Sequence, residues 1–254
     1  MAGPLSFLAM PDAILLLHGA LGARDTLRPL ADALAPLVPA GTPVHAHEFA
    51  GHGATPDPDA ASDAPYDVAR LAAGVLDAMD RDGIARATVF GYSMGGYVAL
   101  LLAAEHPARV RAVVTLATKL AWTPESAARE TSRLDPAAIR AKVPRFADAL
   151  AARHGDAGGW ERVLSRTAAM MHAIAARPTV TPDVLAAIAC PARICVGDRD
   201  ATMTLDECAA AVRALPKGEL AVLPATGHPL EHADPARLAR EVAEVHARAE
   251  TAPS

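Results

Sequence analysis

Ser93 lies at the centre of the run Gly-Tyr-Ser-Met-Gly, residues 91–95. An apolar segment, 88–90, precedes this run, and a long segment of helical character, 97–105, follows it. A serine at so tight a strand-to-helix turn has a strained backbone, which is tolerated only where the flanking positions carry no side chain to clash. The two glycines of the run meet that need, and the hydroxyl would then project above the sheet. The run therefore predicts a serine nucleophile.

A serine hydroxyl is a weak nucleophile until a base removes its proton, so this chemistry needs a histidine and a carboxylate that orients it. The apolar run 192–196 is followed closely by two carboxylates, Asp198 and Asp200. The apolar run 220–223 is followed by His228. The order along the chain is serine, aspartate, histidine, and the spacing alone leaves the choice between the two aspartates open.

The elements that must position these residues are short apolar runs alternating with longer amphipathic segments. Strands are expected at 14–17, 44–49, 88–90, 112–116, 192–196 and 220–223. Helices are expected at 26–38, at 66–82, from 94 to just before Pro107, at 205–215 and at 235–249. This order predicts an α/β fold with a mostly parallel sheet flanked by helices on both faces. Functional residues should lie on loops at the carboxyl ends of the strands.

A long insertion is expected between the fourth and fifth strands. About 75 residues separate these strands, whereas a crossover helix needs only a dozen or more. We expect residues 119–190 to form a helical cap, or lid, and residues 1–118 with 191–254 to form the core domain. Four helical stretches are expected within the cap, at 125–134, 136–153, 160–176 and 182–188.

The serine turn, the aspartate loop and the histidine loop follow successive predicted strands. This order of the three loops resembles that of the α/β-hydrolase fold superfamily, in which the nucleophile, the acid and the histidine follow one another along the chain in the same way. The resemblance covers most of the chain and implies a Ser-His-Asp catalytic triad. The family's G-x-x-D pattern falls on residues 197–200, which favours Asp200 over Asp198. His228 follows a glycine as in the family and is favoured over His232, which is expected to be solvated or packed.

The resemblance also implies an oxyanion hole, a pair of backbone N–H groups that stabilise the developing negative charge. One donor is expected at Met94, directly after the nucleophile and at the start of a helix. Residues 18–22, His-Gly-Ala-Leu-Gly, resemble the family's oxyanion loop. The second donor is therefore expected at Ala20, or at Leu21 if the loop is offset. His18 is expected to brace the loop by hydrogen bonds.

The expected cap should close over Ser93 and determine which substrate group fits. The candidate pocket residues are Leu21, Tyr92, Lys119, Trp122, Trp160, Met170, Met171 and His172. Apolar residues at helical spacing could instead hold the cap to the core. Lys119 follows a strand on the active-site side and could pair with a substrate carboxylate, although a solvated lysine is the commoner case.

Composition narrows the class of protein. The 254 residues are 52% hydrophobic and 21% charged, with a net charge of −5. The charges are interspersed rather than gathered into a basic stripe, so nucleic acid is not an expected partner. The longest apolar runs are about eight residues, short of the roughly 20 that span a bilayer. The first basic residue, Arg24, follows the apolar run 13–17, unlike a secretory signal, so a cytoplasmic protein is expected.

No metal or organic cofactor is expected. The three cysteines, Cys190, Cys195 and Cys208, lack C-x-x-C spacing and are expected to be buried thiols. His45 and His47 alternate along a strand, but no cysteine or carboxylate joins them at metal-ligand spacing.

The expected function is that of a serine hydrolase, a carboxylesterase that cleaves small or medium carboxylic esters through an acyl-enzyme, as a monomer or homodimer. The fold hosts many reactions, so two alternatives stay open. One is a carbon–carbon bond hydrolase or lyase that uses the same triad on an acidic substrate, which would need a basic residue such as Lys119 or a cap arginine. The other is a ligand-sensing binding protein with little turnover, against which the complete triad argues.

Overall fold

The structure is a computed structural model that describes residues 12–58, 64–155 and 158–251 of the chain. Within these residues six strands form one parallel sheet in the order β2-β1-β3-β4-β5-β6. The strands are β1 (Ala13–Leu17), β2 (Val44–His47), β3 (Ala87–Tyr92), β4 (Val110–Leu116), β5 (Ala192–Gly197) and β6 (Gly218–Leu223). Each corresponds to an expected strand, with ends that differ by at most two residues. The expected fold class is confirmed.

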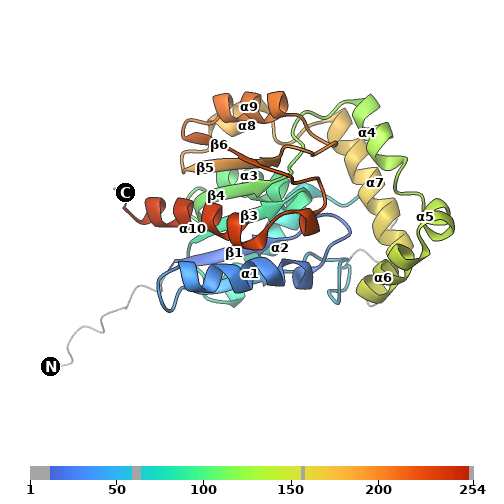
Figure 1. Ribbon diagram of the computed structural model, residues 1–254, viewed down its shortest axis with the longest axis horizontal. Coiled ribbons are helices and arrows are strands. Elements are labelled where there is room, and N and C mark those ends of the chain that lie inside the picture. Colours follow the sequence, from blue (N-terminus) through green and yellow to red (C-terminus); the bar gives the residue numbers. More distant parts are fainter. Residues whose placement is uncertain (1–11, 59–63, 156–157, 252–254) are drawn as a thin grey trace.

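The central strands are mostly apolar because helices cover both faces of the sheet (Figure 1). All residues of β1 and β5 are buried, whereas the edge strands β2 and β6 are largely half-buried or exposed. On one face α1 (Arg28–Leu34) packs against α10 (Pro235–Thr251). On the other, α2 (Val68–Arg81) packs against α3 (Met94–Glu105), and α9 (Leu205–Ala214) packs on β5 and β6.

The first expected helix, 26–38, is not continuous. It is a short 3₁₀ helix η1 (Arg24–Leu27), the α-helix α1, and a second 3₁₀ helix η2 (Ala35–Leu37). Pro36 has no backbone N–H to donate to the preceding turn, so the α-helical hydrogen bonds end there.

The order of the strands creates a crevice above β1 and β3. The chain leaves β1 toward β2 on one side and leaves β3 toward β4 on the other, so the connections diverge between these two neighbouring strands. In parallel sheets ligands bind at the carboxyl ends of the strands where the order reverses in this way. The loop 18–22 after β1 and Ser93 after β3 both lie at this point.

The insertion between β4 and β5 contains α4 (Pro124–Thr131), α5 (Pro136–Lys142), α6 (Pro144–His154), α7 (Trp160–Ala176) and α8 (Pro182–Ala186). Helices α4 to α7 lie together at the right of Figure 1, beyond one end of the sheet. The expected helix 136–153 is wrong as one element, because Pro144 disfavours helical geometry at Val143 and begins α6. Helix α8, which was expected in the cap, packs on α3 and α9 of the core. The division into a core domain and a cap at residues 119–190 stays a prediction.

Other sequence expectations concern thiols, metals and membranes. Cys195 and Cys208 are buried, Cys190 is half-buried, and all three are free thiols. In the described ranges no three side chains of His, Cys, Asp or Glu gather into a group that could hold a metal ion. None of the helices found there combines the length and the apolar character needed to cross a membrane.

Candidate active site

Ser93 occupies the turn between β3 and α3 with φ of 50° and ψ of −112°. Such a conformation is strained for a non-glycine residue and persists only where its surroundings hold it. The Ser93 amide donates to the carbonyl of Leu116 at 2.8 Å, and its carbonyl accepts from the Thr118 hydroxyl at 3.1 Å. A Cβ at Gly95 would collide with the carbonyl oxygen of Leu17. The glycine therefore lets α3 approach β1 closely enough to form the turn.

Three side chains from separate loops meet beside this turn. Oγ of Ser93 lies 3.5 Å from Nε2 of His228, which follows β6. Nδ1 of His228 lies 3.0 Å from Oδ2 of Asp200, which follows β5. The distance between serine and histidine is at the upper end for a hydrogen bond, and such contacts often tighten when a substrate binds. The arrangement can pass a proton from the hydroxyl to the imidazole.

Asp200, and not Asp198, is the carboxylate that reaches His228. The Asp200 side chain is fully buried, and its Oδ1 accepts from the amides of Thr202 at 2.8 Å and Met203 at 3.3 Å. Asp198 accepts instead from the amide of a residue on the histidine loop. Of the two aspartates, Asp200 is therefore the one placed to act as the acid, and that role stays a prediction.

The environment of Asp200 keeps its carboxylate ionised. Burial acts to raise the pKa of Asp200, but hydrogen bonds from His228 and from the amides of Thr202 and Met203 outweigh burial and hold this pKa below its ordinary value. An ionised carboxylate favours a proton on Nδ1 of His228, which leaves Nε2 free to accept one from Ser93.

His18 supports the loop that follows β1. Its buried ring accepts the amide N–H of Phe49 through Nε2 at 3.2 Å, so Nδ1 carries the proton and donates to the carbonyl of Gly19 at 2.8 Å. Burial and the neighbouring His52 lower the pKa of His18 well below its ordinary value, which keeps the ring neutral. The ring therefore braces the loop, as the resemblance implied.

The two expected oxyanion donors line the same cavity as Ser93. Met94 is the first residue of α3, so its amide has no acceptor within the helix. The amide of Gly22 donates to the carbonyl of Gly19 at 3.1 Å and closes a turn that contains Ala20 and Leu21. Their role as donors to an oxyanion stays a prediction.

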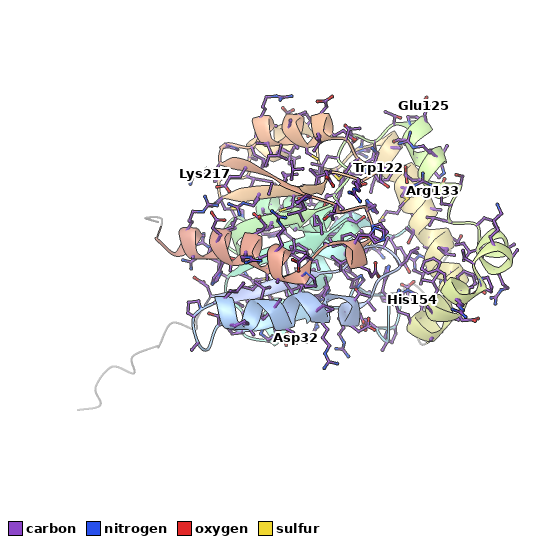
Figure 2. All side chains as sticks on the ribbon, in the orientation of Figure 1. Asp32, Trp122, Glu125, Arg133, His154 and Lys217 are labelled. Atoms are coloured by element: carbon purple, nitrogen blue, oxygen red, sulfur yellow. The ribbon has the colours of Figure 1, made fainter. Side chains whose placement is uncertain are left out.

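His154, which the sequence analysis missed, contacts this loop through a hydrogen bond and lies at α6 in Figure 2. It lies at the end of α6 and its ring is fully buried. Nδ1 accepts the amide N–H of Gly53 at 3.0 Å, so Nε2 donates to the carbonyl of Leu21 at 3.0 Å. Arg153 donates to the same carbonyl at 3.0 Å. No local pattern could reveal these contacts, because Gly53 and Leu21 lie 101 and 133 residues from His154 along the chain.

Replacing His154 with alanine should lower the free energy of unfolding by about 1–3 kcal/mol, because the buried amide of Gly53 loses its acceptor. Urea denaturation at pH 7.5 measures the change. His154→Gln is the informative partner variant, since its amide oxygen can accept and its amide nitrogen can donate, and it should recover part of the loss. A change below about 0.5 kcal/mol for the alanine variant would contradict the role of this contact, because that is the range of ordinary surface substitutions.

A cavity of about 860 Å³ extends over these groups and is lined by the core loops and by residues of α4 and α7. Its lining includes six of the predicted pocket residues: Leu21, Tyr92, Lys119, Trp122, Met170 and Met171. It also includes residues that the sequence analysis did not single out, among them Glu130, Arg133, Leu134, Thr167, Ile174 and Arg199. His232, expected to be solvated or packed, is exposed and also lines the cavity.

The expectation of a solvated Lys119 was wrong, and the contacts of this lysine do not favour a pairing with a substrate carboxylate. The side chain is buried rather than solvated, and Nζ donates to Oε1 of Glu207 at 2.9 Å and to the carbonyl of Thr202 at 3.2 Å. Its charge is therefore neutralised by Glu207, a residue in the first turn of α9, rather than left for a substrate carboxylate. The lysine ties the loop after β4 to the loop that carries Asp200.

Trp160 and His172 were also predicted incorrectly as pocket residues. Trp160 is buried in a second hydrophobic cluster formed by the insertion, with Ile139, Ala147, Leu150 and Leu164. His172 is exposed on α7, where its Nε2 lies 3.1 Å from the hydroxyl of Thr131. Both residues face neighbouring insertion helices, because a predicted helix alone does not reveal which of its faces meets the core.

Comparison with known proteins shows the family to which the chain belongs. The sequence model described as the alpha/beta hydrolase fold matches residues 12–158. A curated relative, the pimeloyl-[acyl-carrier protein] methyl ester esterase of Neisseria meningitidis serogroup B, is 41% identical over 113 residues. That similarity covers 43% of this chain and only 39% of the length of the relative.

Solved structures share the fold at low sequence identity. A thermophilic esterase from Thermogutta terrifontis has a TM-score of 0.74 and 21% identity, covering 95% of this chain and 92% of that one. The 2-hydroxy-6-oxo-6-phenylhexa-2,4-dienoate hydrolase from Rhodococcus has a TM-score of 0.70 and 22% identity, covering 93% and 91%. At such identities these similarities concern the fold alone.

Proposed function

Because the chain belongs to the α/β-hydrolase fold family, we propose that it is a serine hydrolase that cleaves small or medium carboxylic esters. The observation that carries the proposal is the contact series from Ser93 through His228 to Asp200, beside a largely apolar cavity that Ser93 and His228 line. A methyl ester esterase among the partial relatives supports the same reaction class.

The proposed reaction begins with attack of the Ser93 hydroxyl on the ester carbonyl while His228 takes the proton through Nε2. Asp200 stabilises the imidazolium that forms, and the amides of Met94 and Ala20 stabilise the oxyanion. The imidazolium then returns the proton to the leaving alcohol oxygen, and an acyl-enzyme remains on Ser93. Water, deprotonated by the same histidine, attacks the acyl carbonyl and releases the acid.

We further propose that residues 119–190 act as the cap over this site. The contacts of His154 and Arg153 with the Leu21 carbonyl support this role, because they join α6 to the loop of the proposed oxyanion donor. The contacts from Lys119 to Glu207 and to the Thr202 carbonyl join the start of the same segment to the acid loop.

The test combines turnover with labelling of the nucleophile. The wild-type protein should hydrolyse p-nitrophenyl esters with an optimum in acyl length, and a fluorophosphonate should label Ser93, as located by peptide mass spectrometry. Ser93→Ala should give neither turnover nor label while keeping the wild-type circular dichroism spectrum. A labelled serine with no turnover of any ester would instead favour the carbon–carbon hydrolase or lyase. A folded protein that the probe does not label would refute the nucleophile.

A further inference from the structure

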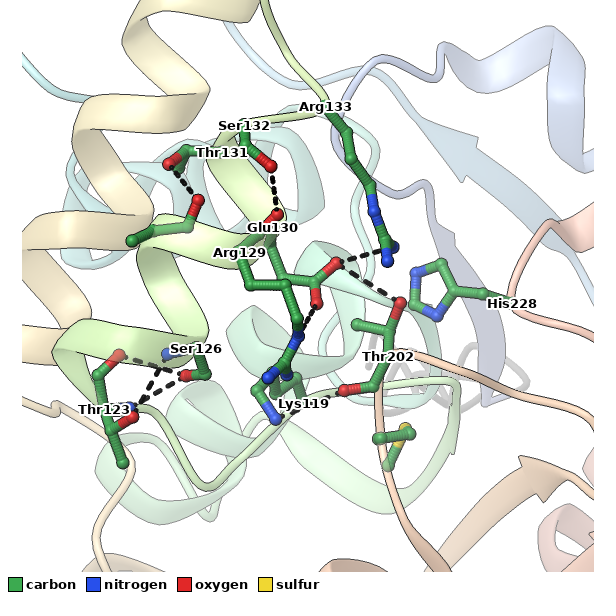
Figure 3. Close-up of polar contacts among 12 residues, drawn as sticks. Lys119, Thr123, Ser126, Arg129, Glu130, Thr131, Ser132, Arg133, Thr202 and His228 are labelled. Carbon is green, nitrogen blue, oxygen red and sulfur yellow. Dashed lines mark hydrogen bonds and ion pairs between the residues drawn. The ribbon is translucent and has the colours of Figure 1, made fainter.

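We propose that the preferred esters carry a carboxylate at the end of an apolar acyl chain, and that Arg133 of the insertion recognises this carboxylate. The inference rests on the proposed ester hydrolysis and adds a substrate class to it. Arg133 lies just after α4, between the insertion and the core (Figures 2 and 3).

The charges around the cavity favour an anionic ligand. Its described lining contains three cationic side chains, Lys119, Arg133 and Arg199, and one carboxylate, Glu130. Lys119 is neutralised by Glu207. Glu130 is shared between two guanidinium groups, so one positive charge beside it stays without a counter-ion.

The contacts of Glu130 fix Arg133 in place. Glu130 is buried, and its Oε1 accepts from Nε of Arg129 at 3.1 Å. Its Oε2 accepts from Nη1 of Arg133 at 3.1 Å and from the Thr202 hydroxyl at 3.5 Å. Thr202 in turn donates its amide N–H to the Asp200 carboxylate at 2.8 Å. The arginine is thus joined through hydrogen bonds to the same loop that orients His228.

Most of the hydrogen-bonding capacity of Arg133 is left for a ligand. A guanidinium has five N–H donors, and in the part of the chain that the structure describes Glu130 is the acceptor recorded for Arg133. The side chain is 57% exposed, and Figure 3 shows its guanidinium directed toward His228. A planar carboxylate fits the free edge of such a group through two parallel hydrogen bonds.

The other side chains that line the cavity determine which kind of acyl segment can connect the substrate carboxylate to the ester group. Its lining is mostly apolar, with contributions from Leu21, Leu134, Met170, Met171 and Ile174. These side chains suit a hydrocarbon segment and offer it no polar partner. A monoester of a linear dicarboxylic acid has this pattern, with the ester at Ser93, methylene groups along the apolar wall and the carboxylate at Arg133.

The experiment compares matched substrates in matched variants. The substrates are monomethyl esters of C4 to C8 dicarboxylic acids and methyl esters of monocarboxylic acids with the same number of carbons. The variants are the wild type, Arg133→Gln, and Arg145→Gln, which removes an equal charge from the exposed surface of α6 outside the cavity lining. The readout is the ratio of kcat/KM for the acidic ester to kcat/KM for the neutral ester.

Arg133→Gln should lower this ratio about tenfold or more, the size of one charge-assisted hydrogen-bond interaction. Arg145→Gln should leave the ratio within about twofold. Equal loss for both ester types in Arg133→Gln, or an unchanged ratio, would overturn the proposal. Retained turnover of the neutral ester shows that the variant is folded.

Binding measured without turnover separates this inference from the proposed reaction. Saturation-transfer NMR on Ser93→Ala should show tighter binding of monomethyl adipate than of methyl hexanoate, and Ser93→Ala combined with Arg133→Gln should lose that preference. Equal binding of the two esters to Ser93→Ala would refute recognition by Arg133 even if the wild type is an active esterase. If the acidic ester binds more tightly in a way that depends on Arg133, but the wild type hydrolyses no ester, the proposed ester hydrolysis is refuted and the recognition by Arg133 stands.

Discussion

Replacing Asp200 with asparagine is expected to lower kcat for ester hydrolysis about 10⁴-fold while the protein stays folded, as the equivalent change does in a serine protease triad. The asparagine amide can donate to Nδ1 of His228, which moves the imidazole proton to Nε2. That nitrogen faces Ser93 Oγ at 3.5 Å and could then no longer accept the hydroxyl proton. Initial rates on the best p-nitrophenyl ester, with circular dichroism as the folding control, measure the effect.

Asp198→Asn is the matched control, because Asp198 lies on the same loop and accepts the amide N–H of Thr226 at 3.2 Å. An asparagine side-chain oxygen can keep that hydrogen bond, so kcat should change less than about threefold, which corresponds to about 0.6 kcal/mol on the activation barrier. A large loss of kcat in Asp198→Asn, together with near-normal kcat in Asp200→Asn, would contradict the proposed triad. It would indicate that Asp198, and not Asp200, is the acid that orients His228.

The free energy of unfolding is expected to fall steeply between pH 8 and pH 5 because four histidines, three buried and one half-buried, are neutral in the folded protein. Burial is the main cause that lowers the pKa of His47 to about 4 and that of His52 to about 3. Burial also lowers the pKa values of His18 and His154. In the unfolded chain a histidine has an ordinary pKa of about 6.5. Below that pH the unfolded state binds more protons than the folded state, so stability is lost as the pH falls.

The expected loss in the free energy of unfolding follows from the pKa values of His47 and His52. Each of His47 and His52 should remove about 2 kcal/mol at pH 5 relative to pH 8, and the other two histidines should add to the loss. Urea denaturation at pH 8, 6 and 5 measures this dependence. His52→Gln should flatten it, with His172→Gln on the exposed surface of α7 as the control for loss of an imidazole. A constant free energy of unfolding over this range would contradict the neutral state of these four rings in the folded protein.

The parts of the site that the sequence predicted all lie in short local patterns. Ser93 and the glycines around it could be identified because a strained turn restricts which residues can stand on either side of the nucleophile. Asp200 and His228 follow apolar strands whose carboxyl ends share one edge of a parallel sheet, so the expected topology brought them to one place. The β-strands were predictable for a related reason, since strands buried on both faces are short, continuous apolar runs.

The insertion was less predictable because its residues find their partners across long separations in sequence. Lys119 was expected to be solvated or to face substrate, yet it pairs with Glu207, 88 residues away. Trp160 was expected in the pocket, yet it fills the hydrophobic cluster of the insertion. Helical periodicity marks an apolar face, and it does not distinguish a neighbouring helix from a cavity.

The sequence by itself therefore determined the α/β fold, the order of serine, aspartate and histidine, and the loops that carry them, because backbone strain and strand burial restrict nearby residues. Only the tertiary structure decided which charges around the cavity are neutralised and which, like that of Arg133, remain for a ligand. It also decided that His154 fixes the loop after β1. Ion pairs and buried hydrogen bonds depend on the distance between groups in space, and packing of the insertion helices against the core sets that distance.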